Sequence, residues 1–150
     1  MKFVDPTPEG EALYELLLQA PRLNRLVQSL TAGQGPHWTI GLWMLLRSIN
    51  VDGPRTVPQI ARALGLARQR IQKIVDEAET GGLVSRQTNP DHKRSQIVAL
   101  TRGGTAKLSR IECEMRLVAQ EMADAFDIRD LDAALRVLIS LQASLDARRR

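Results

Sequence analysis

Hydrophobic residues recur three and four positions apart over residues 7–32, a spacing typical of one face of an α-helix. Thr7 is a suitable N-cap and Pro8 a suitable first helical residue, so we expect the helix to begin there. Pro21 lies inside the pattern and predicts a kink, because proline has no N–H to donate to the preceding turn. The apolar positions form a narrow seam of the coiled-coil kind: Leu13, Leu16, Ala20, Leu23, Val27 and Leu30.

A second stretch, HWTIGLWMLLRSIN (residues 37–50), is apolar on most sides and predicts a largely buried helix. TAGQGP (31–36) before it predicts a loop, and VDGP (51–54) ends it. A short extended piece over Arg55 to Val57 then leads into two short amphipathic helices.

Beyond these helices the pattern becomes strand-like and then helical again. GLVSRQ (82–87) and SQIVAL (95–100) flank the turn-rich basic tip TNPDHKR (88–94), and together they predict a β-hairpin. Helical spacing returns from Thr101, with a seam formed by Leu108, Ile111, Met115, Val118, Met122 and Ala125. Asp127, with Asp130 three residues on, can cap a last helix that carries Leu131, Leu135, Leu138 and Leu145. The predicted fold class is mostly α with one small hairpin.

The short helix pair has the features of a helix-turn-helix. Thr56 and Gln59 have the spacing of a capping box, so the first helix begins at Val57. Gly65 can take the positive φ that ends this helix, and the small Ala61 lets the second helix cross closely. The positions expected to face inward are Ile60, Leu64, Leu66, Ile71, Ile74, Val75 and Ala78.

The outward side of the second helix is polar and basic. It carries Gln69, Gln72, Lys73 and Asp76, with Arg68 and Arg70 at its edges near the N-terminus of the helix. A helix in the major groove presents its first two turns to base edges, where Arg pairs with guanine and Gln with adenine. Lys73 and the backbone amides at the helix starts would hold phosphates. Asp76 would repel phosphate, so we expect it to hold Lys73 or a neighbouring arginine. The alternative interpretation is an ordinary solvated helix face.

The hairpin predicts a second contact with DNA, because an arginine-bearing turn fits the minor groove beside a helix in the major groove. We expect Arg94 at base edges or sugars, and Lys93 and Arg86 near phosphates. Alone, the tip is more typical of a polar turn; directly after a helix-turn-helix it makes a winged helix over residues 36–101. The predicted DNA-binding residues are Thr56, Gln59, Arg68, Gln69, Arg70, Gln72, Lys73, Arg86, Lys93 and Arg94.

Positive charge is concentrated in the same segment. Residues 55–110 contain 11 Lys and Arg against 4 Asp and Glu, whereas residues 1–54 contain 4 against 5 and residues 111–150 contain 6 against 8. A local basic block of this kind is expected of a protein that binds nucleic acid.

The segment TVPQIARALGLARQRIQKIVDEAETGGLVSRQTNPDHKRSQIVALTRGG strongly resembles the MarR family of multiple-antibiotic-resistance-type regulators. The resemblance covers residues 36–108, with GLVSR closing the second helix and ALTRGG opening the next. It implies a dimeric winged-helix transcription factor whose N- and C-terminal helices interlock. It also implies a near-palindromic operator and release by a small, often aromatic, ligand or by an oxidant. The family's wing often carries Asp-x-Arg; here His92 stands at the Asp position, with Asp91 as the alternative carboxylate.

Two apolar seams lie outside the winged-helix segment, in the helices expected over residues 7–32 and 102–148, and an apolar stripe needs a partner. A two-fold dimer would place its recognition helices about 34 Å apart, in successive major grooves. The alternative is that these helices pack only on each other within one chain. The predicted dimerisation residues are Leu13, Leu16, Leu23, Val27, Ile111, Met115, Val118, Leu135 and Leu138.

Other candidate residues give weaker signals. Cys113 could be a redox sensor, but a buried inert thiol is the favoured interpretation. His37, Trp38 and Trp43 could line a cleft for an aromatic effector, although core packing is the safer interpretation. No metal-ligand spacing, GxSxG motif, phosphate-binding glycine loop or catalytic carboxylate pair appears in the sequence. We therefore predict no enzyme, cofactor or metal.

Length and composition fit one soluble domain over residues 1–150, because 43% of the residues are hydrophobic and 25% charged. The N-terminus has no apolar signal segment and the single cysteine suits a reducing compartment, so we expect a cytoplasmic protein. The sequence thus predicts a dimeric DNA-binding regulator, most simply a repressor released by a small ligand. The alternatives are a constitutive DNA-binder, and a small ligand-binding or redox enzyme that uses the helix pair as scaffold.

Overall fold

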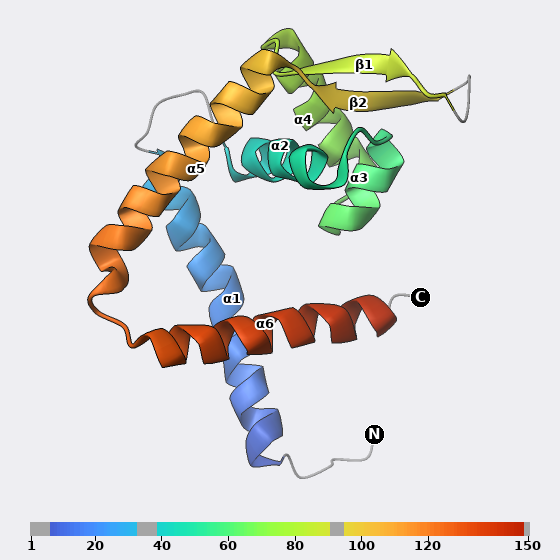
Figure 1. Ribbon diagram of the computed structural model, residues 1–150. Helices are drawn as coiled ribbons and strands as arrows, with labels where there is room; N and C mark the ends of the chain where they lie inside the picture. Colours follow the sequence, from blue (N-terminus) through green and yellow to red (C-terminus); the bar gives the residue numbers. More distant parts are fainter. Residues whose placement is uncertain (1–6, 33–38, 91–94, 149–150) are drawn as a thin grey trace. The chain divides into compact units, whose positions relative to one another are not determined.

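A computed structural model describes residues 7–32, 39–90 and 95–148 (Figure 1). The chain divides into two compact units, Met1–Leu108 and Ser109–Arg150. Within the described residues, six helices and two strands follow one another: α1 (Pro8–Ala32), α2 (Ile40–Asp52), α3 (Val57–Leu64), α4 (Arg68–Thr80), β1 (Val84–Thr88), β2 (Gln96–Leu100), α5 (Arg102–Ala123) and α6 (Ile128–Arg148). We refer to α2, α3, α4, β1 and β2 as the winged-helix region. The predicted fold class and order of elements are confirmed.

The predicted start of α1 is confirmed. The hydroxyl Oγ1 of Thr7 accepts a hydrogen bond from the N–H of Gly10 at 3.1 Å, which satisfies one of the free amides of the first turn. Pro21 lies inside the helix. The helix continues through Thr31 and Ala32, which were expected in a loop; the rest of that loop lies outside the described residues.

The predicted start of α2 at His37 is wrong. Thr39 has an extended backbone and is the N-cap, because its Oγ1 accepts the N–H of Leu42 at 3.1 Å, so the helix begins at Ile40. The helix also runs two residues further than expected, through Asp52, and ends at Gly53 with φ 80°. The start of α2 is thus set by the capping hydroxyl of Thr39 rather than by the extent of the apolar segment.

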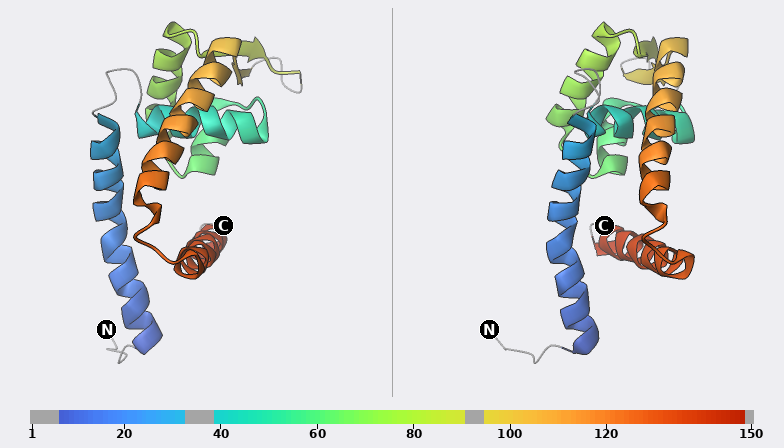
Figure 2. Two further views of the ribbon diagram at one scale, coloured as in Figure 1. Left: turned by 60° about the vertical axis from the view of Figure 1, so that its left-hand side comes forward. Right: turned by 90° about the vertical axis from the view of Figure 1, so that its left-hand side faces the viewer.

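The hairpin pairs antiparallel, with Val84 opposite Leu100 and Arg86 opposite Val98. Arg55 adds a short bridge to the outer side of β2, since its N–H donates to the carbonyl of Val98 at 3.2 Å and its carbonyl accepts the N–H of Val98 at 2.7 Å. The extended piece expected before α3 is therefore confirmed at Arg55, whereas Val57 is already helical. The left view of Figure 2 shows the hairpin projecting to one side of α4, whereas the right view looks nearly along the strands.

One hydrophobic core joins the elements of the winged-helix region. α2 packs against α3, α4 and β2, and α4 packs against α3 and β1. The inward positions expected on α3 and α4 all lie in this core or pack against it, with Leu64, Leu66 and Ile74 only partly buried. The buried residues of the core are Leu45, Leu46, Ile49, Val57, Ile60, Ala61, Ile71, Val75, Ala78, Val84, Val98 and Leu108.

The start of α5 is hydrogen-bonded to the foot of the hairpin, which is formed by Gly82 and Leu83 just before β1. The N–H of Thr101 donates to the carbonyl of Leu83 at 3.1 Å, and its hydroxyl donates to the carbonyl of Gly82 at 2.6 Å. Gly104 lies so close that an added Cβ would be 1.9 Å from the carbonyl oxygen of Leu83. Only glycine therefore fits at this position without a shift of the backbone.

In the Ser109–Arg150 unit, α6 begins as the sequence predicts. Asp127 is its N-cap, because one carboxylate oxygen accepts the backbone N–H of Arg129 at 2.8 Å. The Arg129 side chain also bonds this carboxylate, which lowers the pKa of Asp127 below its ordinary value. Along the described residues, no helix has both the length and the hydropathy needed to span a membrane.

Candidate nucleic-acid interface

Side chains of Thr56 and Gln59 cap the backbone N–H groups at the start of α3. Thr56 Oγ1 accepts the N–H of Gln59 at 3.4 Å, and Gln59 Oε1 accepts the N–H of Thr56 at 2.9 Å, so the predicted capping box is present. Pro58 has no N–H to offer. The first turn of α3 therefore leaves one backbone N–H without a side-chain cap, that of Val57, because the N–H of Gln59 is capped by Thr56 and Pro58 has none.

The start of α4 has the opposite character. Its N-cap is Ala67, whose side chain can accept no hydrogen bond, so no side chain caps the first turn. Arg68, Gln69 and Arg70 follow directly, and all three are exposed. The amides of an uncapped first turn carry partial positive charge and point outward, which is the arrangement that binds an anion.

The outward side of α4 is polar over its whole length. Lys73 is 80% exposed and its Nζ lies 4.0 Å from a carboxylate oxygen of Glu77, a loose surface pair of little energetic weight. The opposite side buries Ile71 and Val75 completely. The predicted division of this helix into an apolar inner side and a polar outer side is confirmed.

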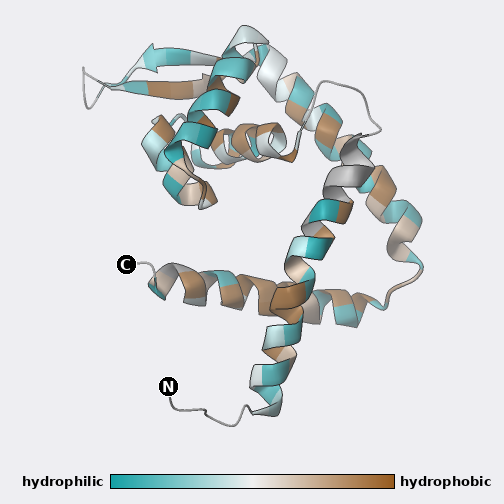
Figure 3. Cartoon of the chain, turned by 180° about the vertical axis from the view of Figure 1, so that it is seen from behind, coloured by the Kyte–Doolittle hydropathy of each residue, from teal (hydrophilic) through white to brown (hydrophobic). Residues whose placement is uncertain are grey.

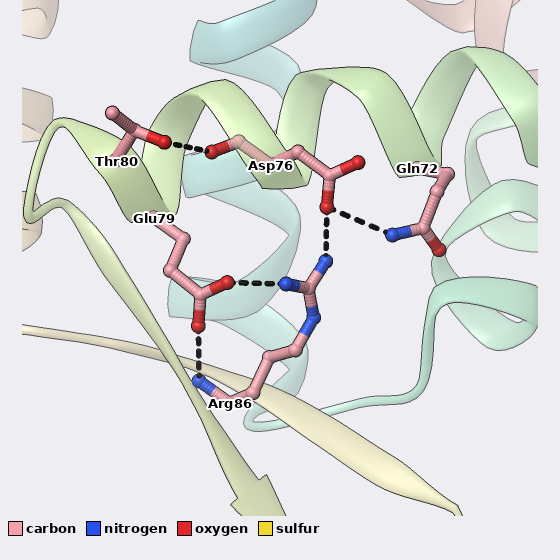
Figure 4. Close-up of polar contacts among 5 residues, drawn as sticks. All are labelled: Gln72, Asp76, Glu79, Thr80 and Arg86. Carbon is pink, nitrogen blue, oxygen red and sulfur yellow. Dashed lines mark hydrogen bonds and ion pairs between the residues drawn. The ribbon is translucent and has the colours of Figure 1, made fainter.

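Arg86 links the hairpin to α4 (Figure 4). Its Nη2 pairs with Asp76 Oδ1 and its Nη1 with Glu79 Oε2, while its backbone N–H donates to Glu79 Oε1 at 3.2 Å. Gln72 Nε2 donates to the same Asp76 oxygen at 2.9 Å. The hydrogen bond from Arg86, and then that from Gln72, lowers the pKa of Asp76 below its ordinary value, although slight burial opposes the shift.

This network changes the interpretation of two residues. Arg86 was expected near phosphates, but it lies in the middle of β1 and its guanidinium is engaged by α4 carboxylates. Asp76 holds this arginine rather than Lys73. Glu79 had not been singled out from the sequence; its position three residues after Asp76, on the same side of α4, is the signal that could have identified it.

A cleft of about 980 Å³ lies between the start of α3, the start of α4 and the hairpin. Five of the predicted DNA-binding residues line it: Thr56, Gln59, Arg68, Gln72 and Arg86. Arg62, which the sequence had not suggested, adds a third arginine to its wall. A concave surface with several cations beside an open helix start is suited to a polyanion.

The hairpin tip, with Lys93, Arg94, His92 and Asp91, lies outside the described residues. The strands below it are held together by Asn89 and Ser95. The side-chain amide of Asn89 donates to Ser95 Oγ at 2.8 Å, and its backbone N–H donates to the Ser95 carbonyl at 3.2 Å. The roles expected for Lys93 and Arg94 stay predictions.

The residues suggested for an aromatic effector are only partly described, because His37 and Trp38 lie outside the described residues. Trp43 is half-buried and packs against the core of the winged-helix region. The guanidinium carbon of Arg47 lies 5.7 Å from the centre of its ring. Among the described residues Trp43 thus has the environment of a core side chain.

The expectation that Cys113 is buried is wrong, since its side chain is exposed. Cys113 is two residues, or more than half a turn, away from the seam position Ile111, so it points away from the apolar side of α5. A buried thiol would have required a covering element on that side.

The predicted dimerisation residues have mixed environments. On α1, Leu13, Leu16 and Leu23 are exposed, and on α6 Leu135 and Leu138 are exposed at 55% and 49%. On α5, Met115 and Val118 are partly exposed, whereas Ile111 is only 1% exposed within the single chain. The side chain of Val27 lies outside the described residues. Figure 3 shows hydrophobic residues recurring along α6.

A helix-turn-helix followed by a two-stranded hairpin defines the winged-helix class. The sequence model of the MarR family matches residues 43–95, which run from α2 into the hairpin. Rv2011c, an uncharacterised protein of Mycobacterium tuberculosis, is 36% identical over 105 residues, which are 67% of this chain and 73% of that protein. The chain belongs to the MarR family.

Solved structures agree with this assignment. The MarR family transcription regulator SP03579 is 28% identical, with a TM-score of 0.75, and the match covers 91% of this chain and 92% of that one. BpsR of Bordetella bronchiseptica, solved to explain how 6-hydroxynicotinic acid regulates its DNA binding, is 15% identical, with a TM-score of 0.74 and coverage of 91% and 97%. At that identity BpsR shows a shared fold alone.

Proposed function

We propose that this protein is a sequence-specific, double-stranded DNA-binding regulator that acts as a dimer. The observation that carries the proposal is the start of α4, where no side chain caps the first turn and Arg68, Gln69 and Arg70 are all exposed. Base edges would be read by these side chains and by Gln72, and phosphates would be held by the α4 amides and Lys73.

Membership in the MarR family and the basic block over residues 55–110 support the same proposal. The structure reduces the set of direct contacts that we propose. The side chains of Thr56 and Gln59 are hydrogen-bonded within the capping box, and Arg86 is paired with carboxylates. We propose that these three shape the interface, while Arg68, Gln69, Arg70, Gln72 and Lys73 touch DNA, joined by Lys93 and Arg94 at the tip.

Salt dependence of binding tests the proposal. The logarithm of the association constant with a duplex should fall linearly with the logarithm of salt concentration, by about 0.9 for each phosphate neutralised. Arg68→Ala should weaken binding by about tenfold, whereas Arg116→Ala, an exposed arginine on α5, should leave it unchanged. Binding no stronger than that of a neutral control protein in dilute buffer would overturn the proposal.

The proposed second copy would cover the exposed leucines of α1 and α6, because a chain rarely leaves so many large apolar side chains in water. It would also bring two recognition helices to one near-palindromic site. Sedimentation velocity over a range of protein concentrations measures this association directly. A monomer at concentrations that saturate the operator would overturn the dimer.

We further propose that the protein is a repressor released by a small, aromatic ligand, comparable to the regulation of BpsR DNA binding by 6-hydroxynicotinic acid. A reporter gene placed behind the bound fragment should be transcribed more strongly when the protein is absent. Small phenols and peroxide, screened separately for release of DNA, test whether an effector exists and of which chemistry. Release by none of them would favour constitutive binding.

A further inference from the structure

Gln72 is the one proposed base-reading side chain in the described part of the chain whose amide is held by another side chain. Its Nε2 donates to Asp76 Oδ1 at 2.9 Å, one turn further along α4. An ionised carboxylate can only accept, so it must face the nitrogen of the amide and turns the oxygen away. Figure 4 shows the amide oxygen of Gln72 on the side away from Asp76.

Asp76 is itself held in place from the hairpin. Arg86 bonds the same carboxylate oxygen through Nη2, and Arg86 is fixed in turn by Glu79 through both its side chain and its backbone N–H. The Arg86 side chain is 21% exposed, so it has little freedom to leave. Thr80 adds a hydrogen bond from its hydroxyl to the backbone carbonyl of Asp76 at 2.9 Å. The Asp76 carboxylate is ionised at neutral pH, since the hydrogen bonds from Arg86 and Gln72 hold its pKa below the ordinary value.

The hydrogen bond to Asp76 uses one of two N–H groups of the Gln72 amide. The carbonyl oxygen and the second N–H remain, and these form the acceptor–donor pair that matches N6 and N7 of adenine in the major groove. A free glutamine can turn its amide by half a rotation and must lose side-chain entropy on binding. A glutamine held by Asp76 is already in one of the two orientations.

We infer that Asp76 and Arg86 are positioning residues that set the base specificity of Gln72, through a relay from the hairpin to the recognition helix, and that Gln72 reads adenine. This inference rests on the proposed DNA-binding function. It gives the Asp76 carboxylate a role beyond its ion pair with Arg86, because the carboxylate orients the Gln72 amide even though its negative charge lowers non-specific affinity for DNA.

The test is a selection of bound duplexes from a library randomised over two successive major-groove turns, carried out with the wild type and each variant in parallel. Gln72→Ala identifies the base pair that Gln72 reads, as the one position whose preference it removes. The wild type should prefer adenine there by about tenfold or more. Asp76→Ala should remove most of that preference at the same base pair and leave the others intact.

Two comparisons separate positioning from a general structural role. Asp76→Ala added to Gln72→Ala should cause no further change in the selected sequence, because both act through one amide. Glu77→Ala, which removes the neighbouring exposed carboxylate outside the relay, should leave the preference unchanged. Affinity of Asp76→Ala for duplexes lacking the selected sequence should be equal to or higher than that of the wild type, because a negative charge has been removed.

The outcomes are distinct. If Asp76→Ala keeps the adenine preference, or weakens all positions equally, the relay has no specific role and the inference is wrong. If Gln72→Ala alters no position, Gln72 reads no base and the inference fails while the proposed function stands. A wild-type protein that enriches no sequence and binds no duplex overturns both.

Discussion

The winged-helix region and α6 use their hydrophobic residues in opposite ways. In the former, Leu45, Leu46, Ile60, Ile71 and Val75 are wholly buried within one chain. In the latter, leucines at the same helical spacing are about half exposed, as at Leu135 and Leu138. The first region completes its core alone and can be a rigid support for the side chains that we propose to read bases. The second presents an apolar surface that is suited to another protein surface.

The largest expected effect comes from the core of the first region. Ile71→Ala removes a completely buried side chain and should lower the free energy of unfolding by about 2–5 kcal/mol. Gln69→Ala, on the exposed side of the same helix, should change it by less than about 0.5 kcal/mol. Urea denaturation followed by circular dichroism measures both. A small loss for Ile71→Ala would mean that this core is not closed.

The second expected effect concerns α6. Leu135→Glu or Leu138→Glu would bring a charge into the proposed contact between copies, and should raise the dissociation constant of the dimer by about thirtyfold, or about 2 kcal/mol. Ser140→Glu, half a turn away and exposed, is the matched control and should not change it. Sedimentation equilibrium gives the constants. Equal effects of all three substitutions would argue against a defined interface on this side of α6.

A smaller effect is expected at the start of α3. Thr56→Ala removes the hydroxyl of the capping box and should lower the free energy of unfolding by about 1 kcal/mol. Thr105→Ala, which removes an exposed hydroxyl from inside α5, is the control and should cost less. Thermal denaturation of the two variants, at matched protein concentration, compares them. A larger loss for Thr105→Ala would contradict the role of the cap.

The smallest effect should appear as a pH dependence. Because the fold lowers the pKa of Asp76 below 3.8, its ion pair stabilises the fold at pH values above that ordinary value. This contribution is lost as the pH falls through the lowered pKa. The stability difference between the wild type and Asp76→Ala should thus be constant from about pH 8 to about pH 5 and shrink only in stronger acid. A difference that already changes near neutral pH would implicate another group.

Local signals in the sequence were sufficient for most of the fold. The Thr56–Gln59 spacing, the position of Gly65 and the apolar spacing on α4 each act within one or two helical turns, so they predict correctly where α3 begins and ends and which side of α4 is buried. The start of α2 was missed because a single hydroxyl, at Thr39, decides it.

The interface was less predictable because its polar contacts join separate elements. Alternation placed Arg86 on a strand correctly, but pairing it with Asp76 and Glu79 depends on how β1 packs against α4, which no local pattern encodes. The exposure of Cys113 similarly depends on what covers the outer side of α5. The sequence thus suggested residues for the candidate interface, and the fold shows which of the described ones already have partners within the chain.

The close approach of Gly104 to Leu83 has a mechanical consequence. With no room for even a methyl group between them, the first turn of α5 cannot slide over the foot of the hairpin. A tilt of this turn must therefore move the hairpin with it.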